Sequence, residues 1–230
     1  MADDIRRAIC DRVNSLLVGG RRIKVLEAGC GSASHVTFMA DVYAVGIDIS
    51  KEQLEKNAVV QEKIIGDIQE CPLPKEEFDA VVCWMVLEHL SRPKDALLNL
   101  FGSIKPRGLL ILAIPNLLSF KGVVTKMTPF WFHELFYRFM RYKSHPFPTY
   151  LRVAIVPKRL TRFAEENGFS VVFCRLLEGD VAKRLRSRFW IVETVFSVLN
   201  SFTRVISLGK SQSLLLDNCF MILRKGGEIS

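Results

Sequence analysis

The sequence predicts an α/β fold in which helices cover both faces of a mostly parallel, doubly wound sheet. Short apolar strand patterns alternate with helical patterns from residue 23 onward, and this order builds parallel β-α-β units. The first strand leads into a glycine-bearing turn, and the second strand ends on a carboxylate, Asp48. At 230 residues the chain is long enough for one sizeable core, so we expect a single domain, 1–230.

Apolar periodicity and capping residues place the individual elements. Ile9, Val13 and Leu16 repeat at helical spacing among charged residues, which predicts an amphipathic N-terminal helix over 3–18 that Gly19-Gly20 ends. Strands are expected at 23–27, 42–47, 61–65, 78–84, 109–114, 169–177 and 214–223. Helices are expected at 34–39, 51–57, 93–104 and 157–167. Two insertions, 117–156 and 178–213, lie outside this pattern.

Composition bounds the environment and the partners. The net charge of +8 and pI of about 9.3 allow binding to RNA, anionic lipid or an acidic small molecule without choosing among them. No uncharged run reaches the roughly 18 residues that a membrane span needs, and the amphipathic N-terminus lacks the features of a signal peptide. The six cysteines form no Cys-x-x-Cys pair. We therefore expect a cytoplasmic protein with reduced thiols.

The first turn and the end of the second strand predict a nucleotide site. Gly29 and Gly31 allow the backbone to approach a ligand closely, and Asp48 follows Gly29 by 19 residues, near the offset of an acid that binds a ribose diol. The turn is a poor phosphate cradle, because Ala33 stands where a dinucleotide site has its third glycine. Glu27, just before the turn, repels phosphates and suits a cationic ligand.

These motifs resemble those of class I S-adenosylmethionine-dependent methyltransferases, and of the small-molecule branch that includes the ubiquinone-biosynthesis enzymes. The matching signals run in order through 23–116: the Glu27–Gly31 turn, Asp48, Gly66-Asp67 with a proline loop, Phe78-Asp79-Ala80-Val81-Val82, Leu87-Glu88-His89-Leu90, Lys105-Pro106-Arg107-Gly108 and Ile114-Pro115-Asn116. The resemblance implies a Rossmann-like, seven-stranded, mostly parallel sheet. Its antiparallel edge would be made by the strands at 169–177 and 214–223.

The resemblance also implies the cofactor, S-adenosylmethionine, with S-adenosylhomocysteine as its product, and the residues that bind it. In the family, the position of Glu27 orders the glycine turn and the methionine part, that of Asp48 binds both ribose hydroxyls, and that of Asp67 meets the adenine amine. The full implied set is Glu27, Gly29, Cys30, Gly31, Asp48, Ile49, Asp67, Ile68 and Trp84. Two alternatives stay open: Asp67 as an ordinary loop acid, and Trp84 as a core residue.

A metal-assisted mechanism is disfavoured by one substitution. Related O-methyltransferases carry a Glu-x-x-Glu-His element that binds a divalent metal, and Met85 replaces its first glutamate here. We therefore expect no metal site. His89 is a candidate general base, although a structural role at a helix start explains it equally well. His133, in the second half of the chain, is the other candidate.

Both insertions carry apolar stripes at helical spacing. The stripe at 131–140 follows the fifth strand, where related enzymes build the acceptor pocket, so an apolar lid is the specific hypothesis. The basic, tryptophan-bearing segment 183–208 can pack against the sheet, form a homodimer interface or lie on an anionic membrane surface, and packing is the commonest use of such a stripe. Nucleic acid is a weaker alternative, because the basic residues form no recognised module.

The expected function is methyl transfer from S-adenosylmethionine to an apolar or lipid-like small molecule, or to a membrane-associated glycan. A non-catalytic cofactor-binding subunit of a methyltransferase complex is the alternative, because no convincing acid–base pair stands out in the sequence. NAD-dependent oxidoreduction is disfavoured by Glu27 and Ala33.

Overall fold

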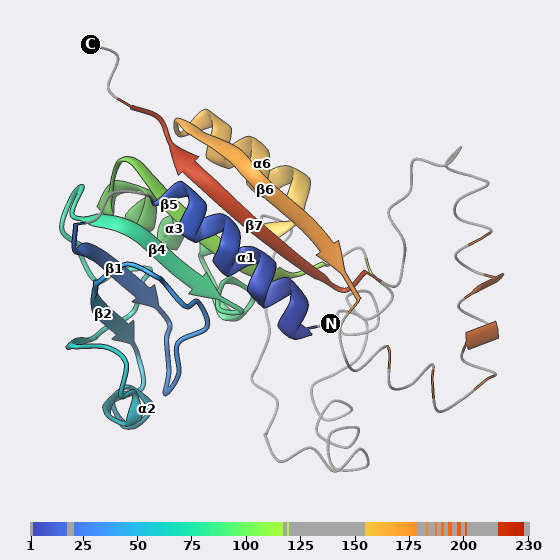
Figure 1. Ribbon diagram of the computed structural model, residues 1–230, viewed down its shortest axis with the longest axis horizontal. Coiled ribbons are helices and arrows are strands. Elements are labelled where there is room, and N and C mark those ends of the chain that lie inside the picture. The colour runs from blue at the N-terminus through green and yellow to red at the C-terminus, as the bar shows by residue number, and fades with distance from the viewer. Residues whose placement is uncertain are drawn as a thin grey trace.

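A computed structural model describes residues 2–17, 21–116, 119, 155–178 and 216–227, with isolated positions between 183 and 201. Its strands are β1 (Ile23–Ala28), β2 (Val42–Asp48), β3 (Glu62–Ile65), β4 (Phe78–Trp84), β5 (Ile104–Pro115), β6 (Phe169–Leu177) and β7 (Asn218–Lys225). Its helices are α1 (Ala2–Leu16), α2 (Lys51–Lys56), the single-turn η1 (Leu87–His89), α3 (Pro93–Ser103) and α6 (Pro157–Glu166). Figure 1 shows these elements around one twisted sheet.

The sheet has seven strands in the order β3-β2-β1-β4-β5-β7-β6. Strands β1 to β5 run parallel to one another, whereas β7 pairs antiparallel with both β5 and β6. This arrangement confirms the predicted mostly parallel, Rossmann-like sheet. From β1 the chain adds strands outward to β2 and β3 on one side, and then continues with β4 and β5 on the other side. The boundary between β1 and β4 is therefore the topological switch point, and open α/β sheets bind ligands at the carboxyl ends of the strands beside it.

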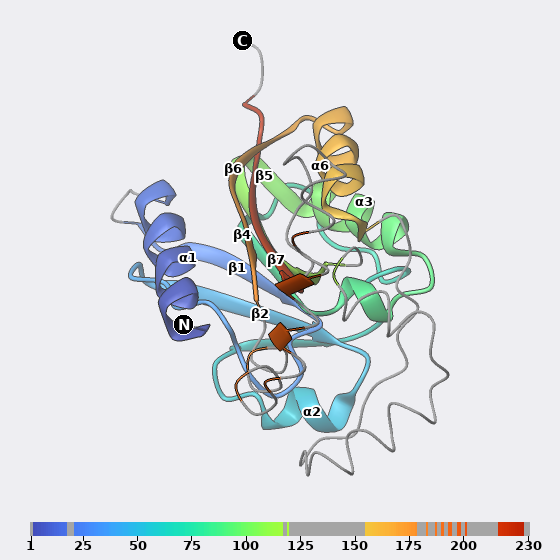
Figure 2. The same ribbon diagram turned by 90° about the vertical axis from the view of Figure 1, so that its right-hand side faces the viewer.

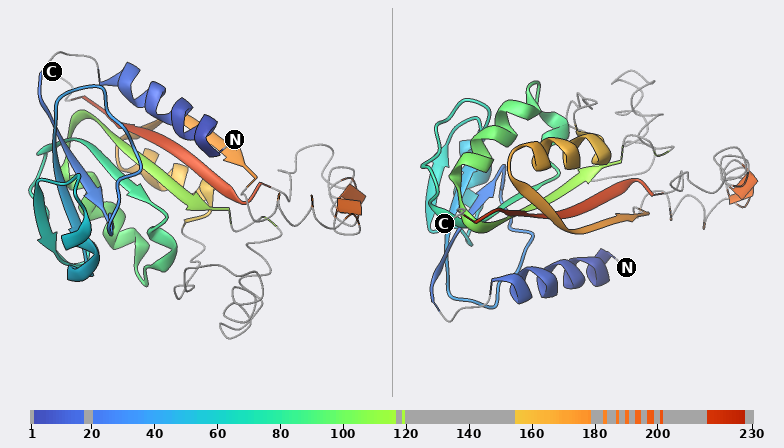
Figure 3. Two further views of the ribbon diagram at one scale, coloured as in Figure 1. Left: turned by 60° about the horizontal axis from the view of Figure 1, so that its bottom comes forward. Right: turned by 90° about the horizontal axis from the view of Figure 1, so that it is seen from above.

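Alternation along the strands gives the sheet two apolar faces. In β1, Val25 faces α1 and Leu26 faces the opposite side, and the same alternation continues through β4, β5 and β7. Ile9 and Val13 of α1 are buried on one face, and Leu97 and Leu100 of α3 on the other. Figure 2 and the right-hand view of Figure 3 show α1 on one side of the sheet and α3 with α6 on the other.

The segment 34–39, predicted as a helix, is an irregular loop instead. Its backbone groups are bonded to polar side chains of α1: Arg6 Nε donates to the carbonyl of His35 at 2.9 Å, and Asn14 Nδ2 to that of Thr37 at 3.2 Å. The amide of Met39 donates to Asn14 Oδ1 at 2.7 Å. The prediction was wrong because α1 supplies the partners that a helix would have provided internally.

Two strand starts also differ from the prediction. β7 begins at Asn218 rather than 214, since pairing with β5 starts at the contact between Asn218 and Pro115. β5 begins at Ile104, because residues that read as a turn are incorporated through a register shift opposite Phe78. Arg107 takes a positive φ of 64° within that irregular stretch.

The cysteines form no disulfide bonds among the described residues. All six cysteines are free, and the sulfurs of Cys174 on β6 and Cys219 on β7 lie 4.0 Å apart. Within the described residues, no helix combines the length and apolarity needed to cross a bilayer. Isolated described positions between 183 and 201 are helical and exposed, Trp190 among them.

Candidate functional site

The turn after β1 is shaped by two glycines in the left-handed region, Gly29 at φ 66° and Gly31 at φ 51°. The amide of Gly29 donates to the carbonyl of Ile47 at 2.8 Å, which fastens the turn to the end of β2. A Cβ at Gly29 would lie 2.6 Å from the Val86 side chain. Both glycines are therefore required by conformation or space, as the sequence predicted.

Asp48 is held by the backbone at the carboxyl end of β2. Its Oδ2 accepts the amide of Gly31 at 2.8 Å, and its Oδ1 accepts the amide of Ser50 at 2.8 Å. A carboxylate offers about four acceptor positions, so about two stay available for a vicinal diol. Asp48 thus joins the glycine turn to the start of α2 and keeps acceptor positions for further donors.

Glu27 is buried at the end of β1, with 4% of its surface exposed. Burial raises the pKa of Glu27 to about 7, and the nearby Ser34 side chain offsets only part of this effect. A desolvated carboxyl group of this kind gains its charge most readily when a cation approaches. The environment therefore suits a cationic ligand rather than a phosphate.

Cys30 and the two isoleucines of the predicted set have contrasting surroundings. Cys30 is buried, and burial, with Asp48 and Glu27 nearby, raises the pKa of its thiol to about 12. Ile68 is buried, whereas Ile49 is 74% exposed directly after Asp48. An exposed apolar side chain at this position can cover one face of a planar base.

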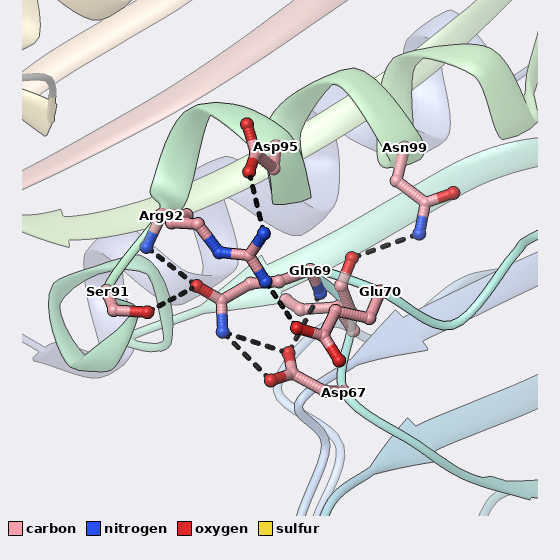
Figure 4. Close-up of polar contacts among 8 residues, drawn as sticks. Asp67, Gln69, Glu70, Ser91, Arg92, Asp95 and Asn99 are labelled. Atoms are coloured by element: carbon pink, nitrogen blue, oxygen red, sulfur yellow. Dashed lines mark hydrogen bonds and ion pairs between the residues drawn. The ribbon is translucent and has the colours of Figure 1, made fainter.

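Asp67 lies in the loop after β3 and is engaged by Gln69, as Figure 4 shows. The Gln69 side-chain amide donates to Asp67 Oδ1 at 3.1 Å and to Oδ2 at 2.9 Å, and the Gln69 backbone amide donates to Oδ1 at 2.8 Å. Sequence analysis did not identify Gln69, because only the fold brings it between this loop and the start of α3.

Trp84, at the carboxyl end of β4, lies on the face of the sheet that α1 covers. Its ring stacks on His35 at a centroid distance of 5.4 Å and tilts against Phe220 at 5.3 Å. Burial, followed by the charge of Arg6, lowers the pKa of His35. Trp84 is therefore part of an aromatic cluster under the 34–39 loop, and His35 is a second residue that sequence reasoning missed.

The candidate general base His89 follows a buried acid. His89 Nε2 lies 3.9 Å from Glu88 Oε1, and the two belong to η1, directly beyond β4. Met85, before this turn, has a positive φ of 52°. Among the described residues, no group of three or more His, Cys, Asp or Glu side chains lies close enough to hold a metal ion.

The other predicted catalytic residue, His133, lies outside the described residues, as do most of the insertions 117–156 and 178–213. The structure therefore brings together Glu27, the glycine turn and Asp48. Asp67 follows β3, which pairs with β2, and Trp84 ends β4, which pairs with β1, so both lie at the carboxyl-end edge of the same sheet.

The arrangement fits the adenosine and the cationic sulfur of S-adenosylmethionine. The positive φ values of the turn favour glycine at both positions, and the Val86 side chain fills the space beside Gly29. Asp48 retains acceptor positions for the ribose, and the buried carboxyl group of Glu27 suits positive charge.

Sequence comparison places these residues inside a known domain. Residues 1–172 match the family model described as a methyltransferase domain. The ubiquinone biosynthesis O-methyltransferase of Schizosaccharomyces pombe is 28% identical over 64% of this chain and 55% of that protein. A probable S-adenosylmethionine-dependent methyltransferase of Mycolicibacterium smegmatis is 31% identical over 48% of this chain and 46% of that protein. The chain thus spans about half the length of these two curated relatives.

Solved structures share the fold at low sequence identity. The [4+2]-cyclase SpnF superposes with a TM-score of 0.60 and 17% identity, over 98% of this chain and 82% of that one. A SAM-dependent methyltransferase from Archaeoglobus fulgidus gives a TM-score of 0.56 and 17% identity, over 98% and 95%. The family model covers well over half of the chain and includes every element that forms the site. The chain therefore belongs to the methyltransferase-domain family, whose cofactor is S-adenosylmethionine.

Proposed function

We propose that this chain transfers a methyl group from S-adenosylmethionine to an apolar or lipid-like small molecule, or to a membrane-associated glycan. The observation that carries the proposal is the junction of the glycine turn with Asp48, where Gly31 donates to the carboxylate at 2.8 Å. When bound, the cofactor supplies a methyl group made electrophilic by a positive sulfur.

The chain's own residues hold the two reactants. Asp48 accepts the ribose hydroxyls, Asp67 accepts the adenine amine, and Glu27 balances positive charge at the methionine end. The glycine turn lets the backbone lie against the ligand without a side chain between them. Methyl transfer asks mainly for such positioning, since near-attack alignment accounts for much of the rate.

The acceptor is proposed to lie beyond the carboxyl ends of β4 and β5. His89, in the turn that follows β4, is the first proposed base for a hydroxyl or amine acceptor. His133 is the second proposed base, and the insertions 117–156 and 178–213 are the proposed acceptor lid or interface. Ubiquinone biosynthesis O-methyltransferases among the relatives, including one from Glaesserella parasuis that is 26% identical over 80% of this chain, support a small-molecule acceptor.

We also propose that the segment 183–208 contributes to a homodimer interface or to a peripheral membrane contact. The alternative function is a non-catalytic cofactor-binding subunit of a methyltransferase complex. The [4+2]-cyclase among the structural neighbours illustrates that this fold alone does not fix the chemistry.

Isothermal titration calorimetry tests the cofactor site directly. We expect S-adenosylhomocysteine to bind in the nanomolar to micromolar range and NAD to give no signal. Asp48→Ala should lower the affinity about 30-fold or more, because charged hydrogen bonds of about 2–3 kcal/mol are lost. Asp41→Ala, which removes an exposed carboxylate paired with Arg22, is the matched control. Equal affinities of both variants and the wild type would contradict the ribose role.

Turnover then separates an enzyme from a binding subunit. Cell extracts incubated with the protein and isotope-labelled S-adenosylmethionine are examined by mass spectrometry for labelled small molecules. A labelled product that requires the protein supports methyl transfer and identifies the acceptor. Tight cofactor binding without any labelled product, in extracts rich in lipids and glycans, would favour the non-catalytic subunit.

A further inference from the structure

Gln69 lies between the acid of the β3–β4 loop and the start of α3. Figure 4 shows its side chain with the amide group directed at Asp67 and the carbonyl group directed at Ser91 and Arg92. Gln69 Oε1 accepts the backbone amide of Arg92 at 2.7 Å and the hydroxyl of Ser91 at 3.2 Å. Because two donors face the oxygen, the orientation of the side-chain amide is fixed by the hydrogen-bond network.

The start of α3 explains why this oxygen is held. Arg92, the N-cap residue, makes no side-chain capping hydrogen bond, and Pro93 occupies the first helical position. Gln69 accepts the amide of the N-cap residue itself, which is the bond that a glutamate or glutamine at the third helical position makes in a capping box. Further along α3, Asn99 Nδ2 donates to the carbonyls of Ile68 at 3.0 Å and Cys71 at 2.7 Å. The loop is thus fastened to α3 at two points on either side of Gln69.

The consequence for Asp67 is a restricted carboxylate. Gln69 provides three hydrogen bonds, two of them to Oδ1 and one to Oδ2. Of the roughly four acceptor positions on a carboxylate, about one is left, and it belongs to Oδ2. A carboxylate fixed in this way can accept a single donor in a defined direction. A freely rotating aspartate would accept donors from many directions.

We propose that Gln69 is a positioning residue that fixes the Asp67 carboxylate and thereby makes the site select a 6-aminopurine over a 6-oxopurine. The inference rests on the proposed function, because it assumes that Asp67 faces the purine of the cofactor. An exocyclic amine donates to the remaining position of Oδ2, whereas a 6-oxo group presents an acceptor that the carboxylate repels. Preorganisation of the acceptor increases the difference between the two ligands.

The test compares S-adenosylhomocysteine with its 6-oxo analogue, S-inosylhomocysteine, by calorimetry. The wild-type protein should bind the amino form at least tenfold more tightly, which corresponds to one charged hydrogen bond. Gln69→Met keeps the length of the side chain but removes both polar groups, and the preference should fall to about threefold or less.

A second variant separates positioning from loop anchoring. Gln69→Glu keeps an oxygen for the Arg92 amide, so the start of α3 stays capped, but it loses the donor to Asp67. Its preference should fall at least as far as in Gln69→Met, because the new carboxylate also repels that of Asp67. Arg92→Met is the control, since it removes the ion pairs with Glu70 and Asp95 and leaves the backbone amide in place.

The possible results are distinct. If the Gln69 variants weaken both ligands equally and keep the wild-type preference, Gln69 only anchors the loop and the inference is wrong. The inference is also wrong if the wild type binds both ligands equally well, or if Arg92→Met loses the preference to the same extent. If the wild-type protein binds neither ligand, the proposed function fails together with the inference.

Discussion

Two carboxylates near the first turn differ in how the protein treats their charge. Asp48 is braced by two backbone amides at 2.8 Å each. Glu27 is buried, and desolvation raises its pKa to about 7. An acid with a raised pKa is partly neutral near pH 7, so a cationic ligand that requires the ionised form competes with a proton.

We expect the affinity for S-adenosylmethionine to rise with pH through about 7. At pH 6 about one tenth of Glu27 is ionised, so the dissociation constant should be about tenfold larger than at pH 8. Glu27→Gln should bind more weakly at pH 8 and should lose this slope. Calorimetry between pH 5.5 and 8.5 measures both effects. A wild-type affinity that is flat over this range would contradict the role given to Glu27.

The same raised pKa has a consequence for folding. The folded protein holds a proton on Glu27 between about 4.5 and 7, a range in which the unfolded chain has already released it. This carboxyl group therefore makes the free energy of unfolding fall as pH rises through that window, in the absence of ligand. Burial of Glu27 thus lowers the free energy of unfolding near neutral pH, and it does so at the place where the cationic ligand is proposed to bind.

At the scale of elements, α1 packs against the sheet and also holds the 34–39 loop by hydrogen bonds. Its apolar positions Ile9 and Val13 are buried against the sheet, whereas Arg6 and Asn14 hold the loop backbone. That loop carries Ser34, which lies near Glu27, and His35, which stacks on Trp84. Helix α1 therefore holds a loop that carries neighbours of two predicted site residues.

Asn14→Ala should lower the free energy of unfolding by about 1–2 kcal/mol, because the hydrogen bonds to Thr37 and Met39 are lost. Ser15→Ala is the control on the same helix, since the Ser15 hydroxyl bonds only to the nearby carbonyl of Arg12 and is exposed. Urea denaturation of the two variants gives the comparison. Similar losses in both variants would mean that the loop draws no stability from Asn14.

The sequence predicts local elements well and long-range polar contacts poorly. Periodicity and the order of motifs place β1, β4 and α6 within a residue or two of the observed bounds. The glycine turn and Asp48 are recognisable because their spacing is local. Gln69 is not, because its partners Ser91 and Arg92 lie more than 20 residues away. The helix expected at 34–39 fails for the same reason, since its backbone partners belong to α1.

At the scale of the whole molecule, another buried acid, Asp79, lies at the amino ends of the strands. Asp79 is the second residue of β4, and its carboxylate is bonded to the Lys24 amide at 2.9 Å, to Lys105 Nζ at 2.9 Å and to Arg21. Burial alone would raise the pKa of Asp79, but these hydrogen bonds and charges outweigh burial and lower it. Asp79 thus links the segment before β1 with β1, β4 and β5 at their amino ends.

We expect Asp79→Asn to lower the free energy of unfolding by about 3 kcal/mol, because cationic partners lose a buried counter-charge. Ligand affinity should stay unchanged, since the site lies at the other end of the strands. Glu77→Gln, which removes a more exposed partner of Lys24, should cost about 1 kcal/mol or less. Urea denaturation and calorimetry on both variants provide the measurements, and a large loss of affinity in Asp79→Asn would contradict this separation.

The pH response of Asp79 has the opposite sign to that of Glu27. A lowered pKa means that its stabilising effect is present above the ordinary value of 3.8 and is lost as pH falls below it. In Asp79→Asn this loss at acid pH should disappear.

The location of the Asp79 cluster offers a practical route to a sturdier protein. Substitutions that improve packing or charge balance around Arg21, Lys24 and Lys105 lie at the amino ends of the strands, away from the glycine turn and Asp48. A heat-resistant derivative can therefore be selected there without altering the proposed cofactor site. Such a derivative would stay folded during the long incubations and in the organic co-solvents that assays of apolar candidate acceptors require.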